Sequence, residues 1–377
     1  MKDSTFFPEI HGNFGFGCMR LPMKDGKVNY DEFTKMAEAF LDAGFNYFDT
    51  AHGYIGGQSE TAIRDCVAHR FARNRFLLTN KLTEPYFDSQ ADIRPFFENQ
   101  LKWCGVDYFD FYLMHAQDRN NYQKFKRCKA YETAWQLREE GLIRHFGISF
   151  HDKAEVLNDI LNEHPEIEVV QIQFNYVDYN DASVESRKVY EVCEKHGKPV
   201  IVMEPVKGGS LVNLPPKADS IFRQLNGGSN ASYAVRFAAS FPNMTMVLSG
   251  MSNMAQMNDN LSAMRDFQPL NQAELQAVWK VCDIFKAQNL IPCTACRYCV
   301  EENHCPKNIR IPDQFAALNA YEAFHNWNSK FYYESVLTDD THGKASDCIK
   351  CGMCEKVCPQ HLEIRKLLTN VAKAFDK

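Results

Sequence analysis

The sequence predicts an α/β protein, in which a closed (β/α)8 TIM barrel precedes a smaller α-helical domain. Three observations favour this reading. Between about residues 14 and 264, eight short apolar runs alternate with eight amphipathic stretches, the count and length typical of such a barrel. An open doubly wound sheet fits less well, because FGFGCMR, at the first run, is not a G-x-G-x-x-G turn. Eight of the 14 cysteines lie between Cys293 and Cys358, outside the alternating region.

The predicted strands are short, rich in β-branched or aromatic residues, and bounded by polar or glycine-containing segments. In chain order they are Phe14–Cys18, Asn46–Asp49, Phe76–Thr79, Asp110–Met114, His145–Ser149, Val169–Phe174, Val200–Glu204 and Thr245–Ser249.

Helices are predicted between the strands. In DEFTKMAEAFLDAG the apolar residues from Phe33 to Leu41 share one helical face, and Gly44 follows as a stop signal. Comparable stretches lie at about 59–72, 88–104, 124–140, 152–162, 182–195, 230–240 and 253–264.

A domain boundary is predicted near residue 288. The segment NQAELQAVWKVCDIFKAQ has the pattern of a linking helix, and two mutually similar cysteine-rich segments follow it. We therefore expect a barrel domain at 1–288 and a cysteine-bearing domain at 289–377.

The second cysteine-rich segment has the spacing C-x2-C-x2-C-x3-C-P, with Cys348, Cys351, Cys354 and Cys358. This is the pattern of bacterial ferredoxins, in which three thiolates bind one 4Fe–4S cluster and the fourth ligates a neighbouring cluster. The segment therefore predicts one cluster of its own and one ligand for another.

The first cysteine-rich segment holds Cys293, Cys296 and Cys299, and then Cys305 after a longer gap of five residues. A longer loop before Cys305 is compatible with its role as a ligand of the neighbouring cluster. Cys305 is the expected fourth ligand, with His304 as the alternative. The long spacer before the second segment has a helical pattern, so the two 4Fe–4S clusters are expected in an α-helical ferredoxin-like domain.

Zinc and unligated thiols are the alternatives for these eight cysteines. Three closely spaced cysteines with a distant Cys-Pro do not have the spacing of zinc fingers. Eight free thiols so close together would be prone to oxidation.

Charge and hydropathy exclude several classes of partner. The net charge is −6, from 42 Lys and Arg against 48 Asp and Glu, so no basic excess indicates nucleic-acid binding. The start MKDSTFFPEI lacks the basic-then-apolar pattern of a signal peptide, and no apolar run has the length of a membrane span. A cytoplasmic protein with no membrane partner is expected.

Four polar residues are predicted at the C-terminal ends of successive strands, where barrels of this type carry out chemistry. Asp49 ends the second strand, and Tyr54 follows it by five residues. Lys81 and His115 end the third and fourth strands. Each residue alone is also explained as a helix cap or a structural residue, but four of them in order at successive strand ends favour an active site.

These four residues resemble the Asp, Tyr, Lys and His tetrad of the aldo-keto reductase family, and the resemblance covers about residues 1–265. It implies that Tyr54 protonates a carbonyl oxygen as hydride arrives, and that His115 orients the carbonyl. It also implies an ion pair between Lys81 and Asp49, whose ammonium lowers the pKa of Tyr54 from about 10 toward neutrality. The substrate is then a small carbonyl compound.

The resemblance extends to residues that would bind the nicotinamide and pyrophosphate of a dinucleotide. Ser149 and Gln171 match the residues that hydrogen-bond the nicotinamide carboxamide, although Phe150 replaces the asparagine that usually follows the serine. Met203 aligns with the aromatic residue that stacks on the nicotinamide. The remaining matches, which allow close approach to the pyrophosphate, are Gly208 and Gly209.

The adenosine end departs from the family pattern. Gln256 and Asn260 match the adenosine-binding helix, but the family's cationic clamp for a 2′-phosphate is missing, because its lysine aligns with Gly250 and its arginine with Gln256. Both NADP and NAD therefore remain as cofactors.

Three functions follow from these patterns. The first is an enzyme that transfers hydride between NAD(P)H and an aldehyde or ketone, with clusters in a structural or electron-relay role. The second is an electron-transfer protein, in which a redox partner protein meets the clusters, although no flavin fingerprint is visible to split a hydride into single electrons. The third is a cofactor-binding regulatory subunit. The intact tetrad favours the first.

Overall fold

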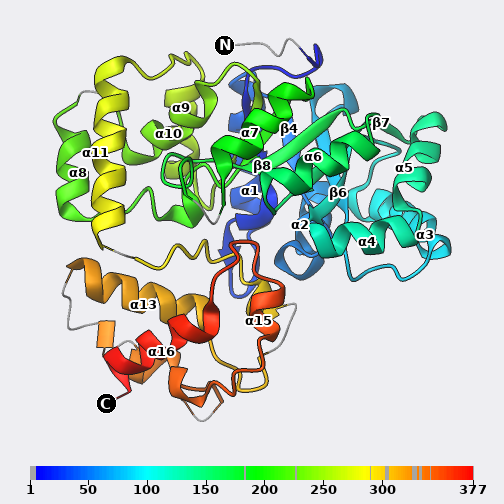
Figure 1. Ribbon diagram of the computed structural model, residues 1–377. Helices are drawn as coiled ribbons and strands as arrows, with labels where there is room; N and C mark the ends of the chain where they lie inside the picture. The colour runs from blue at the N-terminus through cyan, green and yellow to red at the C-terminus, as the bar shows by residue number, and fades with distance from the viewer. Residues whose placement is uncertain are drawn as a thin grey trace. The chain divides into compact units, whose positions relative to one another are not determined.

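The computed structural model describes residues 6–376 except 182–183, 226, 289, 302–304, 325–328, 331–332 and 340. It contains two compact units (Figure 1). The first comprises residues 1–180, 185–205 and 231–271, and the second comprises 181–184, 206–230 and 272–377. Within the described part of the chain, no helix has both the length and the apolar character needed to cross a membrane.

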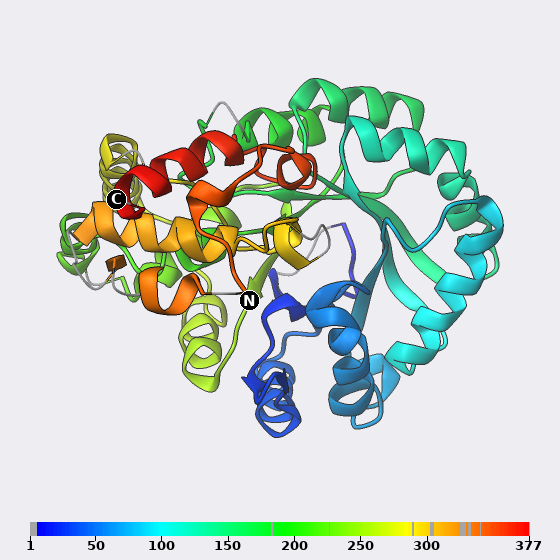
Figure 2. The same ribbon diagram turned by 90° about the horizontal axis from the view of Figure 1, so that it is seen from below.

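The first unit is a closed barrel of parallel strands with helices around it (Figure 2), as the sequence predicts. The strands follow the chain around the barrel, and β1 closes it by pairing with both β4 and β10. All eight predicted strands are confirmed. Their bounds are β1 Phe14–Gly17, β4 Tyr47–Asp49, β5 Leu77–Leu82, β6 Phe109–Gln117, β7 Ile143–Phe150, β8 Val169–Gln173, β9 Val200–Met203 and β10 Met244–Gly250.

The helices of this unit cover the barrel because each presents an apolar stripe to the strands. In α1, for example, Phe33, Met36 and Phe40 are fully buried. The helices are α1 Tyr30–Asp42, α2 Gln58–Ile63, α3 Gln90–Cys104, α4 Arg119–Arg127, α5 Ala130–Glu139, α6 Ala154–Glu163, α7 Ser186–Lys195, α9 Asn230–Ala239 and α10 Met254–Met264.

Strand register determines which side chains meet at the C-terminal end of the barrel. Asp49 lies opposite Gly17 on β1 and Thr79 on β5. Ser149 of β7 lies opposite Gln171 of β8. Deeper in the barrel, apolar residues from the strands form one buried cluster that also includes Phe7 and Ile10, which precede β1. The interior is therefore filled, and only the strand ends are available for a site.

Several local predictions were wrong. The stretch 124–140 is not one helix: Lys129 takes a left-handed conformation (φ 52°) between α4 and α5, and Asp118 caps α4 by accepting from the backbone N–H groups of Asn120 and Asn121. A short hairpin of β2 Met23–Lys24 and β3 Lys27–Val28 follows β1, where no strand was predicted. Such turns depend on single backbone angles, which apolar periodicity does not report.

The second unit has no strand among its described residues, in agreement with an α-helical ferredoxin-like arrangement. Its cysteine-bearing part has an apolar core that includes Phe315, Leu368 and Phe375 together with the buried Cys299 and Cys354. The linking helix is α11, and the prediction of a domain boundary near residue 288 stays a prediction. The helices are α8 Pro216–Arg223, α11 Gln272–Gln288, α12 Tyr298–Glu301, α13 Ile311–Phe324, α15 Met353–Lys356 and α16 Ile364–Phe375.

Candidate active site and cluster sites

The four predicted tetrad residues come together at the C-terminal end of the barrel. Lys81 of β5 is the centre of the group: its Nζ donates to Asp49 Oδ1 at 2.7 Å and to the Thr50 carbonyl at 2.8 Å. It also lies 3.3 Å from the Tyr54 hydroxyl oxygen. An ammonium group has three protons, and these three acceptors match them. The fourth residue, His115 of β6, packs its ring edge against Tyr54, with ring centroids 6.1 Å apart.

Burial controls the charges in this group. Lys81 has no exposed side-chain surface, and burial lowers its pKa, while the charge of Asp49 opposes that shift. Burial also lowers the pKa of His115 well below its usual value, and the charge of Lys81 adds to the effect. His115 is therefore neutral at physiological pH. Its Nδ1 lies 2.8 Å from the hydroxyl of Thr83, which leaves Nε2 as the nitrogen able to contact a substrate.

Tyr54 is presented by a tight turn that the sequence patterns did not reveal. In the 3₁₀ segment Tyr54–Gly57, Ile55 has φ 54°, an unfavourable left-handed angle for a β-branched residue. His52 and Glu60 join the two sides of this turn, with Nδ1 and Oε2 2.6 Å apart. The ring of His52 also stacks on Trp103 at 4.5 Å.

Glu60 is itself held in place from the barrel. It has no exposed surface, and its Oε1 accepts hydrogen bonds from Asn80 Nδ2 at 2.8 Å and Gln100 Nε2 at 3.2 Å. A buried carboxylate with these partners is a rigid anchor for the turn. The sequence patterns did not identify Glu60 as a functional residue, because its burial cannot be recognised from one sequence.

The residues predicted to hold the nicotinamide end lie at the same end of the barrel. The hydroxyl of Ser149 accepts from the Ala116 backbone N–H at 2.8 Å. Gln171 donates through Nε2 to Asp49 Oδ2 at 3.1 Å, so it links the predicted nicotinamide site to the tetrad. Met203 ends β9 and is partly exposed.

The two predicted pyrophosphate glycines belong to the second unit. Both have positive φ angles, 62° at Gly208 and 98° at Gly209. A Cβ atom on Gly208 would lie 2.2 Å from the Thr294 carbonyl oxygen, so only glycine fits this close approach. The structure thus brings Gly208 against the first cysteine-rich segment, and its predicted contact with a nucleotide stays a prediction.

The predicted adenosine residues lie on or beside α10. Gly250 ends β10 opposite Gly17 of β1. Asn260 is buried, and its Nδ2 donates to the Ser249 hydroxyl at 3.1 Å. Its Oδ1 has no hydrogen-bond partner in the described part of the chain. Gln256 is exposed and folds back, so that its Oε1 accepts from the Ser252 N–H at 2.7 Å.

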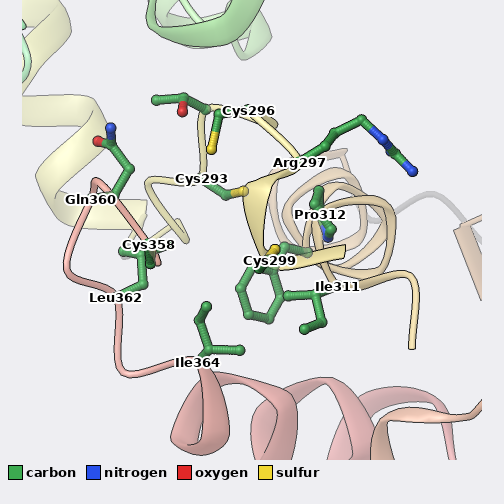
Figure 3. Close-up of a pocket in the computed structure, with 12 residues that line it drawn as sticks. Cys293, Cys296, Arg297, Cys299, Ile311, Pro312, Cys358, Gln360, Leu362 and Ile364 are labelled. Atoms are coloured by element: carbon green, nitrogen blue, oxygen red, sulfur yellow. The ribbon is translucent and has the colours of Figure 1, made fainter. Parts of the chain in front are cut away.

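Four cysteines of the second unit surround a cavity (Figure 3). It is lined by Cys293, Cys296 and Cys299 of the first segment together with Cys358 of the second segment. Apolar side chains complete the wall, among them Ile364. Four thiols around an apolar cavity fit the ligand set of a 4Fe–4S cluster, and the fourth thiol comes from the other segment, as the spacing predicted.

The other four cysteines are also neighbours. Burial, the charge of Glu355, and the neighbouring thiols of Cys348, Cys305 and Cys351 together raise the pKa of Cys354 to about 12. Thiols that resist ionisation in this way become thiolates when they bind a metal. This grouping places Cys305 with the second segment, while His304 lies outside the described residues.

Comparisons with known proteins agree with this geometry. Residues 13–283 match the model of the aldo/keto reductase family, and residues 292–362 match that of a 4Fe-4S dicluster domain. The second match indicates iron–sulfur clusters in that region.

Individual relatives are distant. An uncharacterized oxidoreductase of Bacillus subtilis, YqkF, is 24% identical over 307 residues, which are 72% of this chain and 94% of that protein. Human aldo-keto reductase family 1 member C3 is 29% identical over 180 residues, 43% of this chain and 53% of that protein. Among solved structures, an aldo-keto reductase from Klebsiella pneumoniae in complex with NADPH has a TM-score of 0.61 at 22% identity, covering 74% of this chain and 95% of its own.

Proposed function

Because this chain belongs to the aldo/keto reductase family of NAD(P)-dependent oxidoreductases, we propose that its barrel transfers hydride between NAD(P)H and the carbonyl carbon of an aldehyde or ketone. The observation that supports this most directly is the position of the Lys81 ammonium between Asp49 and the Tyr54 hydroxyl. Such a group stabilises a phenolate, so it fits a tyrosine that gives up its proton during turnover.

Each of the tetrad residues has its own role in the proposed reduction. A bound reduced nicotinamide supplies the hydride, which adds to the carbonyl carbon. Tyr54 donates its hydroxyl proton to the carbonyl oxygen, which becomes an alcohol. Lys81 keeps its own protons and stabilises the phenolate left on Tyr54, while Asp49 maintains the position and charge of the ammonium.

His115 has a different role from Tyr54. Since burial keeps its imidazole neutral, it does not supply a second positive charge. We assign the Thr83 hydroxyl as the donor to Nδ1 of His115, so that Nε2 carries the proton and donates a hydrogen bond to the carbonyl oxygen. This orients the substrate for attack and polarises the carbonyl bond.

The described residues fit a dinucleotide at the strand ends. Ser149 and Gln171 lie side by side across β7 and β8, next to Asp49. The unpartnered buried Oδ1 of Asn260 is a ready acceptor for a donor on a ligand, because an unsatisfied buried oxygen is costly. These residues would hold the nucleotide, and Met203 would pack against its nicotinamide ring.

Replacing Tyr54 with phenylalanine tests the proposal. We expect Tyr54→Phe to lower kcat for aldehyde or ketone reduction by about 100-fold or more, because the proton donor is lost, while nucleotide affinity is retained. Steady-state kinetics over a carbonyl panel and calorimetric nucleotide titration measure the two effects. Tyr30→Phe, at an exposed tyrosine, is the matched control. Unchanged turnover in Tyr54→Phe would refute the role.

For the second unit we propose two 4Fe–4S clusters, one bound by each group of four cysteines, in a structural or electron-relay role. A relay to an electron-transfer protein is the alternative function of the chain, and the closeness of the two cysteine groups favours it. Hydride carries two electrons, whereas one cluster normally accepts one, so an NAD(P)H-driven relay needs both clusters or an intermediary. EPR spectra of the anaerobic protein after addition of NADH or NADPH distinguish the roles: unreduced clusters in a protein that reduces carbonyls indicate a structural role.

A further inference from the structure

We propose that the barrel binds NAD(H) in preference to NADP(H), and that Glu32 and Gln256 determine this choice. The inference rests on the proposed function and concerns only the adenosine end of the nucleotide. The two cofactors differ there by one group, a phosphate on the 2′-oxygen of the ribose. A site that accepts this phosphate needs cations or unoccupied backbone N–H groups, because it carries up to two negative charges.

Three backbone N–H groups at the start of α10 already donate to side chains of the protein. The Met254 N–H donates to Glu32 Oε1 of α1 at 3.1 Å. The Ser252 N–H donates to Gln256 Oε1 at 2.7 Å, and the Gln256 N–H donates to Asn253 Oδ1 at 3.0 Å. Two of the N–H groups in the first turn of α10, those of Met254 and Gln256, are therefore already used by side chains of the protein itself.

One of these side chains is itself an anion. The Glu32 carboxylate lies at the first turn of α10, where it interacts favourably with the positive end of the helix dipole. A 2′-phosphate bound at the same turn would compete with Glu32 for these N–H groups and would be repelled by its charge. A ribose hydroxyl, by contrast, is a donor, and a carboxylate is the acceptor that dinucleotide-binding sites of other folds use for this hydroxyl.

The cation beside Gly250 is already paired. The side chain of Arg20 lies across Gly250, and its Cβ and Cδ are 3.3 Å from where a Gly250 Cβ would stand. The guanidinium of Arg20 is 3.7 Å from the carboxylate of Glu204, which neutralises it. A lysine at position 250 would have to displace Arg20, so Gly250 and the Arg20–Glu204 pair together occupy the place of a cationic clamp.

The charges around this turn thus favour a neutral ribose. Arg20 contributes one positive charge, whereas Glu32 and Glu204 contribute two negative charges, and Gln256 contributes none. Charge-assisted hydrogen bonds are the strong ones, and the positive group described beside this turn, Arg20, already lies against Glu204.

The experiment compares NADH and NADPH binding to the complete, cluster-loaded protein by anaerobic calorimetry. In the unchanged protein we expect NADH to bind at least about tenfold more tightly than NADPH. In the double variant Glu32→Gln, Gln256→Arg, we expect NADPH to bind about tenfold more tightly than it does to the unchanged protein. NADH should bind less tightly, because the ribose hydroxyl loses the Glu32 carboxylate as its acceptor. The single variant Gln256→Arg keeps the Glu32 contact to α10 and should also bind NADPH more tightly than the unchanged protein does. It replaces the double variant in the test if the double variant does not fold.

Asp31→Asn is the matched control. Asp31 is an exposed carboxylate next to Glu32 in the first turn of α1, so its removal changes the net charge by the same amount and should leave the NADH preference unchanged. Equal affinities, or tighter NADPH binding, in the unchanged protein would overturn the inference and leave the proposed hydride transfer standing. Failure of both nucleotides to bind would instead overturn the proposed function.

Discussion

We expect Thr83 to fix which nitrogen of His115 carries the proton. Its hydroxyl is buried and lies 2.8 Å from His115 Nδ1. Replacement by valine removes this partner and keeps the shape. We expect Thr83→Val to lower kcat about tenfold, because the imidazole loses its orientation and tautomer, with unchanged nucleotide affinity. Steady-state kinetics and a nucleotide titration measure these effects.

The conservative variant at the same position is the control. Thr83→Ser keeps the hydroxyl and should restore most of the turnover. If Thr83→Val reduces carbonyls as fast as the unchanged protein, then the tautomer of His115 does not depend on Thr83, and the orienting role fails.

At the scale of elements, a histidine on β7 joins the segment before β1 to the barrel. His145 Nε2 lies 2.5 Å from Glu9 Oε1, and its Nδ1 lies 3.3 Å from Glu168 Oε1. Burial acts to lower the pKa of His145, but these two carboxylates outweigh it and raise the pKa. A raised pKa means that the ion pairs stabilise the fold fully below about pH 6.5, the ordinary value, and that this contribution is lost as the pH rises through the folded-state pKa.

The His145→Phe variant should show this pH dependence. We expect it to unfold at lower urea concentration than the unchanged protein at pH 6, by the equivalent of about 1 kcal/mol after solvent screening, and the difference should shrink at pH 9. Circular dichroism during urea titration at both pH values measures it. His11→Phe, at an exposed histidine, should show no such pH dependence. A destabilisation that is equal at both pH values would mean that packing, not charge, explains the role of His145.

At the scale of the whole molecule, we propose that the two cysteine segments exchange ligands between the two clusters of the second unit. Cys358 lines the cavity of the first segment, and Cys305 lies with the second. We expect Cys358→Ala to alter the same cluster as Cys293→Ala, and Cys305→Ala to alter the same cluster as Cys348→Ala. Each variant should retain about half of the roughly eight irons of the full protein. Iron and sulfide assays with EPR of the reduced proteins identify the cluster affected.

The EPR spectra of the four variants show which cysteines share a cluster. If the EPR spectrum of Cys358→Ala matches that of Cys348→Ala instead, each segment binds its own cluster with all four of its cysteines. The two clusters would then be independent, and the loss of one segment would leave the other cluster intact.

Much of the fold was predictable because it depends on local patterns. The apolar runs at the eight strands are local, and all eight strands are confirmed. The C-x2-C-x2-C spacing is local as well, and it predicted a cluster domain that the family match confirms. The tetrad positions at Asp49, Lys81 and His115 followed from one rule, that the C-terminal strand ends of a barrel meet at one face.

The amino-acid sequence was enough to give the order of strands and helices, the ligand spacing of the clusters and the polar residues at the strand ends. It did not show which side chains meet once the elements have packed. Examples are the ring of His52 with that of Trp103, and Glu32 with the Met254 N–H, 222 residues apart. The physical reason is that periodicity reports which face of an element is buried, whereas hydrogen bonds and ion pairs depend on distances of a few ångströms that arise only when the elements pack.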